Sequence, residues 1–125
     1  MDNKGEILRR TKAFARRIIK LYCALPKSTE AQVIGKQVLR SGTSVGAHVR
    51  EGKRSRSDAE MVSKSESALQ ELEETLYWLE LLVDSGIVKA ERLTALIAEA
   101  DEIIAMLVVS VKTLKKRRRG TKEER

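Results

Sequence analysis

The sequence predicts an all-α protein that folds as an antiparallel up-down-up-down four-helix bundle. Hydrophobic residues recur in alternating steps of three and four along four segments, which is the spacing of the buried face of a helix. The 125 residues include a single proline, and 42% are hydrophobic while only 3% are aromatic, which favours helices around an aliphatic core. The connections between the segments are short, and short connections place consecutive helices side by side in opposite directions.

The first helix is predicted over residues 5–25, and it ends before Pro26 because proline cannot continue a helix. Its buried face comprises Ile7, Thr11, Phe14, Ile18, Leu21 and Leu25. The second helix is predicted over residues 29–52, with Ser28 or Thr29 as its N-cap. Its buried face comprises Ile34, Val38, Val45 and Val49.

The third helix is predicted over residues 58–84, because Ser57 and Glu60 form the S-x-x-E pattern of a capping box and Ser85-Gly86 is a stop signal. The fourth is predicted over residues 89–116. We therefore expect a single domain over residues 1–116, followed by a basic, disordered tail over residues 117–125.

Charge is distributed unevenly along the chain, whose net charge is +7. Residues 57–111 contain twelve acidic and three basic side chains, whereas the segments before and after them are basic. This asymmetry favours complementary packing between helices or subunits, and it also allows a basic surface that faces a polyanion. No apolar run suits a membrane span or a signal peptide, and the single Cys23 fits a reducing compartment, so we expect a cytoplasmic protein.

The segment RSGTSVGAHVREGKR, residues 40–54, could be a phosphate-binding loop or part of a helix. A P-loop requires G-x-x-x-x-G-K-[ST] after a strand, but Ala47 occupies the first glycine position and Arg54 the last. We therefore interpret the segment as helical. Glycines inside a helix cost about 1 kcal/mol each, so Gly42 and Gly46 predict the close approach of another helix, within the bundle or between subunits. We assign these two glycines to a subunit interface.

Basic side chains form a stripe along the outward face of each of the first two predicted helices, and a basic run follows the fourth. Arginine can bind a phosphate bidentately, and the scarcity of aromatic residues predicts recognition of backbone and shape rather than of bases. A solvated face, or one half of an ion-pair set with the acidic helices, is an equal alternative, and the tail could be a solubility or membrane-surface run. The first stripe holds Arg9, Lys12, Arg16, Lys20 and Lys27. The predicted nucleic-acid-binding residues are Arg16, Lys20, Lys36, Arg40, Arg50, Lys53, Arg54, Lys115, Lys116, Arg117, Arg118 and Arg119.

The third predicted helix is apolar almost all round between residues 76 and 83, although a helix in a monomeric bundle needs only one apolar stripe. We therefore assign Tyr77, Trp78, Leu81 and Leu82 to a subunit interface. The alternative is a broad core that uses more of this helix.

No set of residues suggests catalysis or metal binding. A di-iron site in a bundle needs Glu-x-x-His motifs, but His48 is the only histidine and Val45 stands three residues before it. Cys23 has no histidine nearby in sequence, so we interpret it as a packed small residue. We predict no catalytic residue, no metal and no cofactor, and we expect that the protein is not an enzyme.

Two motifs closely resemble the family of 23S rRNA intervening-sequence proteins. These are RSGTSVGAHVREG, and ALQELEET with the YWLELL that follows, against R-S-G-T-S-V-G-A-N-I-x-E-G and L-x-E-x-x-E-T-x-Y-W-L in the family. The departures are His48 in place of asparagine and Val49 in place of isoleucine. The resemblance implies a ring-shaped homopentamer of four-helix bundles with no attached enzymatic activity. It also points to a related accessory protein of diversity-generating retroelements, which works with a reverse transcriptase and is thought to bind nucleic acid.

The leading hypothesis is therefore a non-enzymatic, homo-oligomeric accessory protein that binds nucleic acid, structured RNA in particular, through basic helix faces. The alternative is a protein-interaction scaffold that docks a partner enzyme such as a reverse transcriptase and has no specific role with nucleic acid. The salt dependence of nucleic-acid binding separates these two hypotheses.

Overall fold

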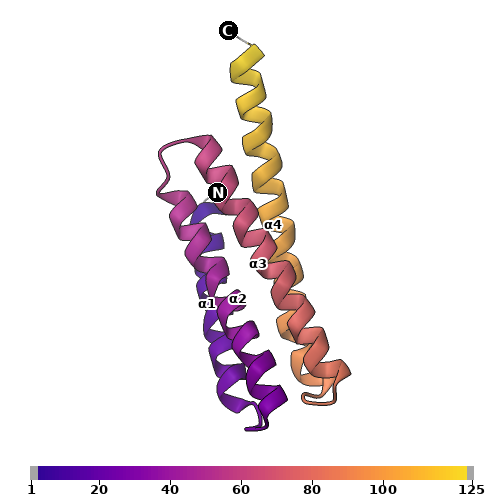
Figure 1. Cartoon of the computed structure of the whole chain (residues 1–125). Helices are drawn as coiled ribbons and strands as arrows, with labels where there is room; N and C mark the ends of the chain where they lie inside the picture. Colours follow the sequence, from indigo (N-terminus) through magenta and orange to yellow (C-terminus); the bar gives the residue numbers. More distant parts are fainter. Residues whose placement is uncertain (1–2, 124–125) are drawn as a thin grey trace.

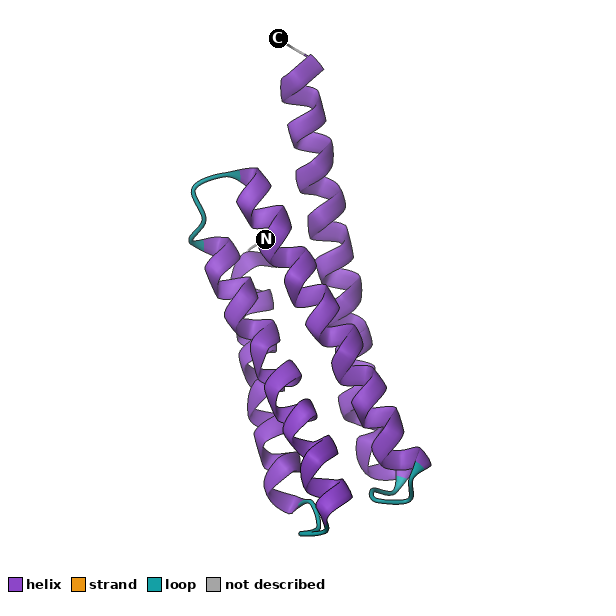
Figure 2. Cartoon of the chain, in the orientation of Figure 1, coloured by secondary structure: helices purple, strands orange, loops and turns teal. Residues whose placement is uncertain are grey.

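The computed structural model describes residues 3–123, which form four α-helices and, over that range, no strand (Figure 2). The helices are α1 (Asn3–Ala24), α2 (Thr29–Lys53), α3 (Asp58–Asp84) and α4 (Ala90–Glu123). The predicted all-helical class is confirmed, and seven of the eight predicted helix ends lie within two residues of the observed ones. The exception is the C-terminal end of α4.

The four helices lie alongside one another, and the chain reverses direction at each connection (Figure 1). Helix α2 packs against α1 and α3, and α4 packs against α3 and α1. Ion pairs link α2 to α3: Arg40 on α2 pairs with Glu71 on α3, and Glu51 pairs with Lys64. None of the described helices has the length and apolarity to cross a bilayer.

The core is aliphatic, as the hydrophobic spacing predicts. Each helix contributes side chains that are fully shielded from water, and each such side chain stabilises the fold by about 1.5–3 kcal/mol. They include Phe14, Ile18, Val38, Val45, Leu72, Leu79, Leu82, Leu93 and Ile103. One polar layer interrupts this core, because the hydroxyl of Thr75 on α3 lies 2.8 Å from Ser41 Oγ on α2, and Ser41 donates in turn to the Gln37 carbonyl.

The ends of α3 follow the predicted capping chemistry. Ser57 has an extended backbone, and its hydroxyl accepts a hydrogen bond from the Glu60 N–H at 3.1 Å. After α3, Gly86 has a φ of +71° and the N–H of Ile87 donates to the carbonyl of Leu82. Only glycine adopts that backbone conformation without strain, so Gly86 stops the helix as predicted.

The predicted disordered tail differs from the structure over residues 117–123, where α4 continues as a helix. Lysine and arginine near a helix C-terminus interact favourably with its dipole, and Arg117 also pairs with Asp58 of α3. The composition of a basic run is therefore compatible with a disordered tail and equally with the last turns of a helix that pairs with a neighbouring helix. Residues 124–125 lie outside the described range.

Candidate nucleic-acid interface

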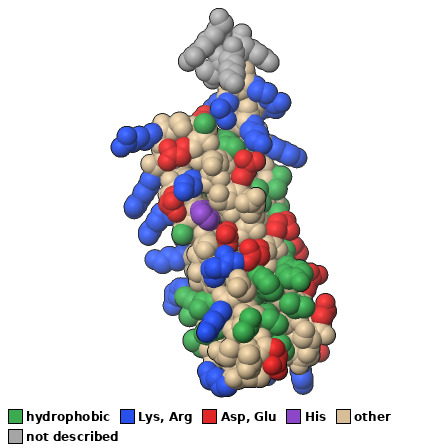
Figure 3. Space-filling model, viewed as in Figure 1, with side chains coloured by type: hydrophobic (Ala, Val, Ile, Leu, Met, Phe, Trp, Pro, Cys, Tyr) green, Lys and Arg blue, Asp and Glu red, His purple; other side chains and the backbone are tan. Residues whose placement is uncertain are grey.

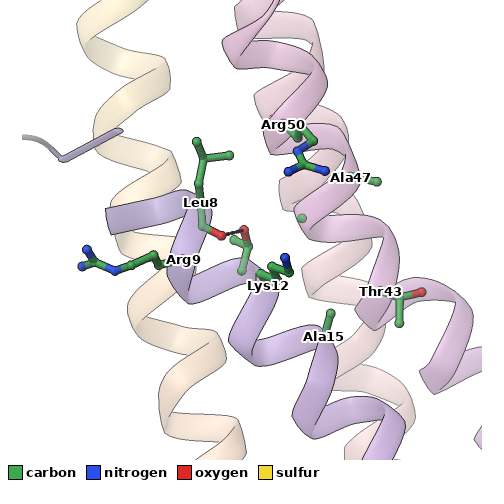
Figure 4. A pocket seen from close by; sticks show the side chains of 9 residues that line it. Leu8, Arg9, Lys12, Ala15, Thr43, Ala47 and Arg50 are labelled. Carbon is green, nitrogen blue, oxygen red and sulfur yellow. Dashed lines mark hydrogen bonds between the residues drawn. The ribbon is translucent and has the colours of Figure 1, made fainter. Parts of the chain in front are cut away.

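A groove of about 350 Å³ lies between α1 and α2 on the surface of the bundle (Figure 4). Small residues from both helices, Ala15, Gly46 and Ala47, are among those that line it. Helix α1 supplies Leu8, Arg9, Thr11, Lys12 and Ala15, and α2 supplies Thr43, Gly46, Ala47 and Arg50.

The groove exists because two glycines bring α2 close to α1. A Cβ atom at Gly46 would lie 3.4 Å from Thr11 Oγ1, and one at Gly42 would lie only 2.8 Å from the Ile18 Cγ1 atom. Both glycines therefore serve a contact inside the chain. For the buried Gly42 the within-bundle alternative describes the contact, because Ile18 of the same chain fills the space beside it; the assignment of the groove-lining Gly46 to a subunit interface stays a prediction.

Two cations extend over this groove, and a third flanks it. Lys12 and Arg50 extend into the space between the helices from opposite sides, and Arg9 lies on the outer flank of α1 (Figure 4). All three side chains are exposed, and none forms an ion pair or hydrogen bond with any described residue. Exposed cations without a carboxylate partner are available to an external anion.

Residues 3–109 match the family of proteins described as 23S rRNA-intervening sequence protein. The chain belongs to this family. This confirms the resemblance inferred from the two sequence motifs.

A solved structure supports both family and fold. It is a protein of unknown function from the S23 ribosomal protein family of Bacteroides thetaiotaomicron VPI-5482, and it is 36% identical to this chain. The match covers 87% of this chain and 97% of that one, with a TM-score of 0.83. No curated protein matches the chain.

The other predicted nucleic-acid-binding residues of this family member fall into two groups. One group is exposed or half-exposed outside the groove and forms no ion pair with a described residue. It comprises Arg16, Lys20, Lys36, Arg54, Lys116, Arg118 and Arg119. Lys53 lies apart from both groups, lining a second cavity of about 450 Å³ beside the connection from α2 to α3.

The second group is already paired with carboxylates. Arg40 on α2 forms ion pairs with Glu71 and Glu74 on α3, and its Nε donates to Gln37 at 3.2 Å. This cation therefore takes part in the contact between α2 and α3, as the ion-pair alternative anticipates. Two cations of the C-terminal run are held in the same manner, Lys115 by Glu66 and Arg117 by Asp58.

Charge separates across the bundle as the sequence predicts. Most basic side chains on the face in Figure 3 line the edge of α1 and α2, and acidic side chains line the opposite edge. On the acidic side, hydrogen bonds to Arg10 lower the pKa of Glu99, and the same bonds raise the pKa of Arg10. Arg10 is thus the one basic residue of α1 that forms an ion pair in the described part of the chain.

The four residues of α3 assigned to a subunit interface differ in exposure. Tyr77 is 56% exposed and packs edge-on against Trp78, with ring centroids 5.0 Å apart, and Leu81 is half-buried. Leu82 is fully buried in the core of its own chain, so its assignment to an interface is wrong. The broad-core alternative therefore holds for Leu82, while Tyr77, Trp78 and Leu81 form an exposed patch, here called the α3 patch.

The chain has one cysteine and one histidine, Cys23 and His48. Cys23 is exposed rather than packed, because it lies on the outer face of the last turn of α1. The Nδ1 atom of His48 is buried without a hydrogen-bond partner. In the range that the structure describes, no three histidine, cysteine or acidic side chains come together as a metal site would require.

Arg9 and Lys12 are the site residues that the sequence-based selection missed. Both belong to the basic stripe of the first helix, but the predicted nucleic-acid-binding residues of that stripe are Arg16 and Lys20. The groove centres on the point where Thr11 meets Gly46. That register depends on how α1 and α2 pair in space, which the helical period alone does not specify.

Proposed function

We propose that this protein is a non-enzymatic accessory protein that binds nucleic acid by its phosphate backbone in the groove between α1 and α2. The observation that carries the proposal is the pair of unpaired cations Lys12 and Arg50 over a floor of small residues, with unpaired Arg9 on the flank of α1. Small residues allow a sugar-phosphate backbone to approach the helices closely, and the cations neutralise its charge.

Structured RNA is the ligand that we favour. The groove contains no aromatic side chain on which an unpaired base could stack, so recognition of backbone and shape is the mode it supports. The description of the family refers to sequences that intervene in 23S rRNA, which favours RNA over DNA.

The test is fluorescence anisotropy of the nuclease-treated protein with a structured RNA, a DNA duplex and a single strand. The informative variant is R9A/K12A/R50A, which removes the three groove cations. We expect a loss of affinity for RNA of about tenfold or more at low salt, because several phosphate contacts disappear together.

The matched control is K27A/K89A/R92A, which removes the same net charge from three exposed positions that do not line the groove. We expect this control to lose much less affinity. Equal losses in both variants would mean that only net charge matters and that the groove is not the site.

We also propose that the protein self-associates, in the ring of five copies implied by the family resemblance, through the α3 patch. An exposed tyrosine beside a half-exposed tryptophan is typical of subunit contacts. Light scattering after gel filtration should show a smaller assembly for Y77S/L81S than for the wild type. The control I19S/V109S changes two exposed apolar residues outside the patch and should leave the assembly unchanged.

A scaffold that docks a basic partner, such as a reverse transcriptase, is the second candidate function. It is favoured by a groove of about 370 Å³ between α3 and α4, where Glu80, Asp84 and Asp101 surround Val83 and Ile97. Long basic side chains can lay their aliphatic stems on such a floor and pair with its rim. Co-purification of one specific protein after nuclease treatment, lost in E80Q/D84N/D101N, would favour this function over the first.

A further inference from the structure

The C-terminal part of α4 extends beyond the other three helices and carries most of the basic run (Figure 1). We call residues 112–120 the α4 extension. It is anchored at its base, where Val111 and Leu114 pack against Val62 of α3 in a small apolar cluster apart from the main core. Beyond this cluster, charged side chains of the extension pair with charged side chains of α3.

Two of its cations are bound by carboxylates of α3 in a geometry that also suits phosphate. Arg117 donates from Nε to Asp58 Oδ2 at 2.9 Å and from Nη2 to Oδ1 at 2.6 Å, a bidentate contact. Lys115 Nζ lies 3.2 Å from Glu66 Oε2. A guanidinium binds two oxygens of a carboxylate or of a phosphate through the same fork of N–H groups.

These pairs are open to water and to competing anions. The side chains of Lys115, Glu66 and Arg117 are 50%, 51% and 57% exposed, and that of Asp58 is 36% exposed. Ion pairs at such exposure are weak, so an external phosphate can replace the carboxylate.

We infer that the α4 extension is a second phosphate-binding element, in which Asp58 and Glu66 occupy the places that two nucleic-acid phosphates take in the complex. The inference rests on the proposed function. It adds that carboxylates of the protein itself compete with nucleic-acid phosphates for the same two cations. In the free protein the two carboxylates hold Arg117 and Lys115 in position and lower the affinity for nucleic acid. In the complex the phosphates displace them, and the carboxylates become solvated.

The experiment compares the RNA affinity of the full-length wild type with that of D58N/E66Q, which keeps the shapes of both side chains and removes their charge. The matched control is E60Q/E73Q, because Glu60 and Glu73 lie on the same helix, form no ion pair with described residues and give the same change in net charge. Glu60 and Asp58 both lie in the first turn of α3, so each variant removes one carboxylate that interacts favourably with the helix dipole.

We expect D58N/E66Q to bind RNA about threefold or more tighter than E60Q/E73Q, since the charges of Asp58 and Glu66 no longer compete with phosphate for the two cations. The gain should disappear when K115A/R117A is added to D58N/E66Q. Equal affinities of D58N/E66Q and E60Q/E73Q would overturn the inference while leaving the groove proposal intact. Absence of RNA binding by the wild type and by every variant would instead overturn the proposed function, and this inference with it. Circular dichroism of each variant verifies that the helices remain formed.

Discussion

Gly46 on α2 lies directly against Thr11 on α1, so that a Cβ atom at Gly46 would be 3.4 Å from Thr11 Oγ1 and 3.5 Å from the Thr11 carbonyl carbon. This contact sets the separation of the two helices and thereby the depth of the basic groove. One turn earlier, Gly42 is tighter still, because a Cβ there would lie 2.8 and 2.9 Å from two atoms of the buried Ile18.

The two glycines therefore predict opposite effects of the same substitution. G42A should lower the free energy of unfolding by about 1–3 kcal/mol, because the added methyl overpacks a core with no room for it. G46A should raise it by about 0.5–1 kcal/mol, because the methyl fits at ordinary contact distance and alanine favours the helix. Urea unfolding at a fixed protein concentration measures both, and a G42A protein as stable as the wild type would show that Ile18 has space to move.

The buried hydroxyls of Ser41 and Thr75 predict that removing one of them costs more unfolding free energy than removing the second. T75V should destabilise the protein by about 1 kcal/mol, because it removes a hydrogen bond and leaves Ser41 Oγ without its donor. In S41A/T75V both partners are apolar, so the double variant should cost less than the sum of the two single variants. Strict additivity of the unfolding free energies would mean that the two hydroxyls do not interact.

Acid should weaken the contact between α1 and α4. Hydrogen bonds from Arg10 lower the pKa of Glu99 below its usual 4.5, so the folded state favours the ionised carboxylate. The stabilisation is then complete above pH 4.5 and is lost as the pH falls through the lowered pKa of the folded state. We expect the unfolding free energy of E99Q to fall less than that of the wild type between neutral pH and a pH well below 4.5. The exposed Glu91, changed to glutamine, is the control and should follow the wild type.

Arg40 and Arg50 lie on the same helix but should differ in their contribution to nucleic-acid binding. Arg50 has no carboxylate partner in the described chain. A phosphate at Arg40 would instead have to displace two carboxylates, Glu71 and Glu74, of which Glu71 is only 22% exposed. R50A should weaken RNA binding and reduce the slope of log affinity against log salt by about 1, as expected for one lost phosphate contact. R40A should change the slope by much less. A larger effect of R40A than of R50A on the salt slope would move the site from the α1–α2 groove to the α2–α3 contact.

The helices themselves follow from the sequence, because apolar spacing, the Ser57 cap and the Gly86 stop are local signals that the packing reinforces. Composition alone did not predict the structure of the C-terminal segment. Its basic residues are typical of a disordered segment, but Arg117 pairs with Asp58 at the start of another helix. Such a pairing depends on the tertiary register of α3 and α4, which no local pattern contains.

The site was predicted less completely for the same reason. Helical spacing placed Arg50 on a basic face, but it did not show that Arg40 on that face has partners on α3 or that Gly42 faces Ile18. Leu82 illustrates the converse error, since an apolar residue on a helix that is apolar all round can face either the core or a partner. Both cases require the positions of neighbouring helices, which is the information that the structure adds.

The most direct test of the account is the salt dependence of RNA binding by the wild type and by R9A/K12A/R50A. If the groove cations contact phosphates, the slope of log affinity against log salt should fall by about three in the variant, one for each lost contact. The same slope in both proteins would contradict the account, because the groove cations would then release no counterions from the nucleic acid.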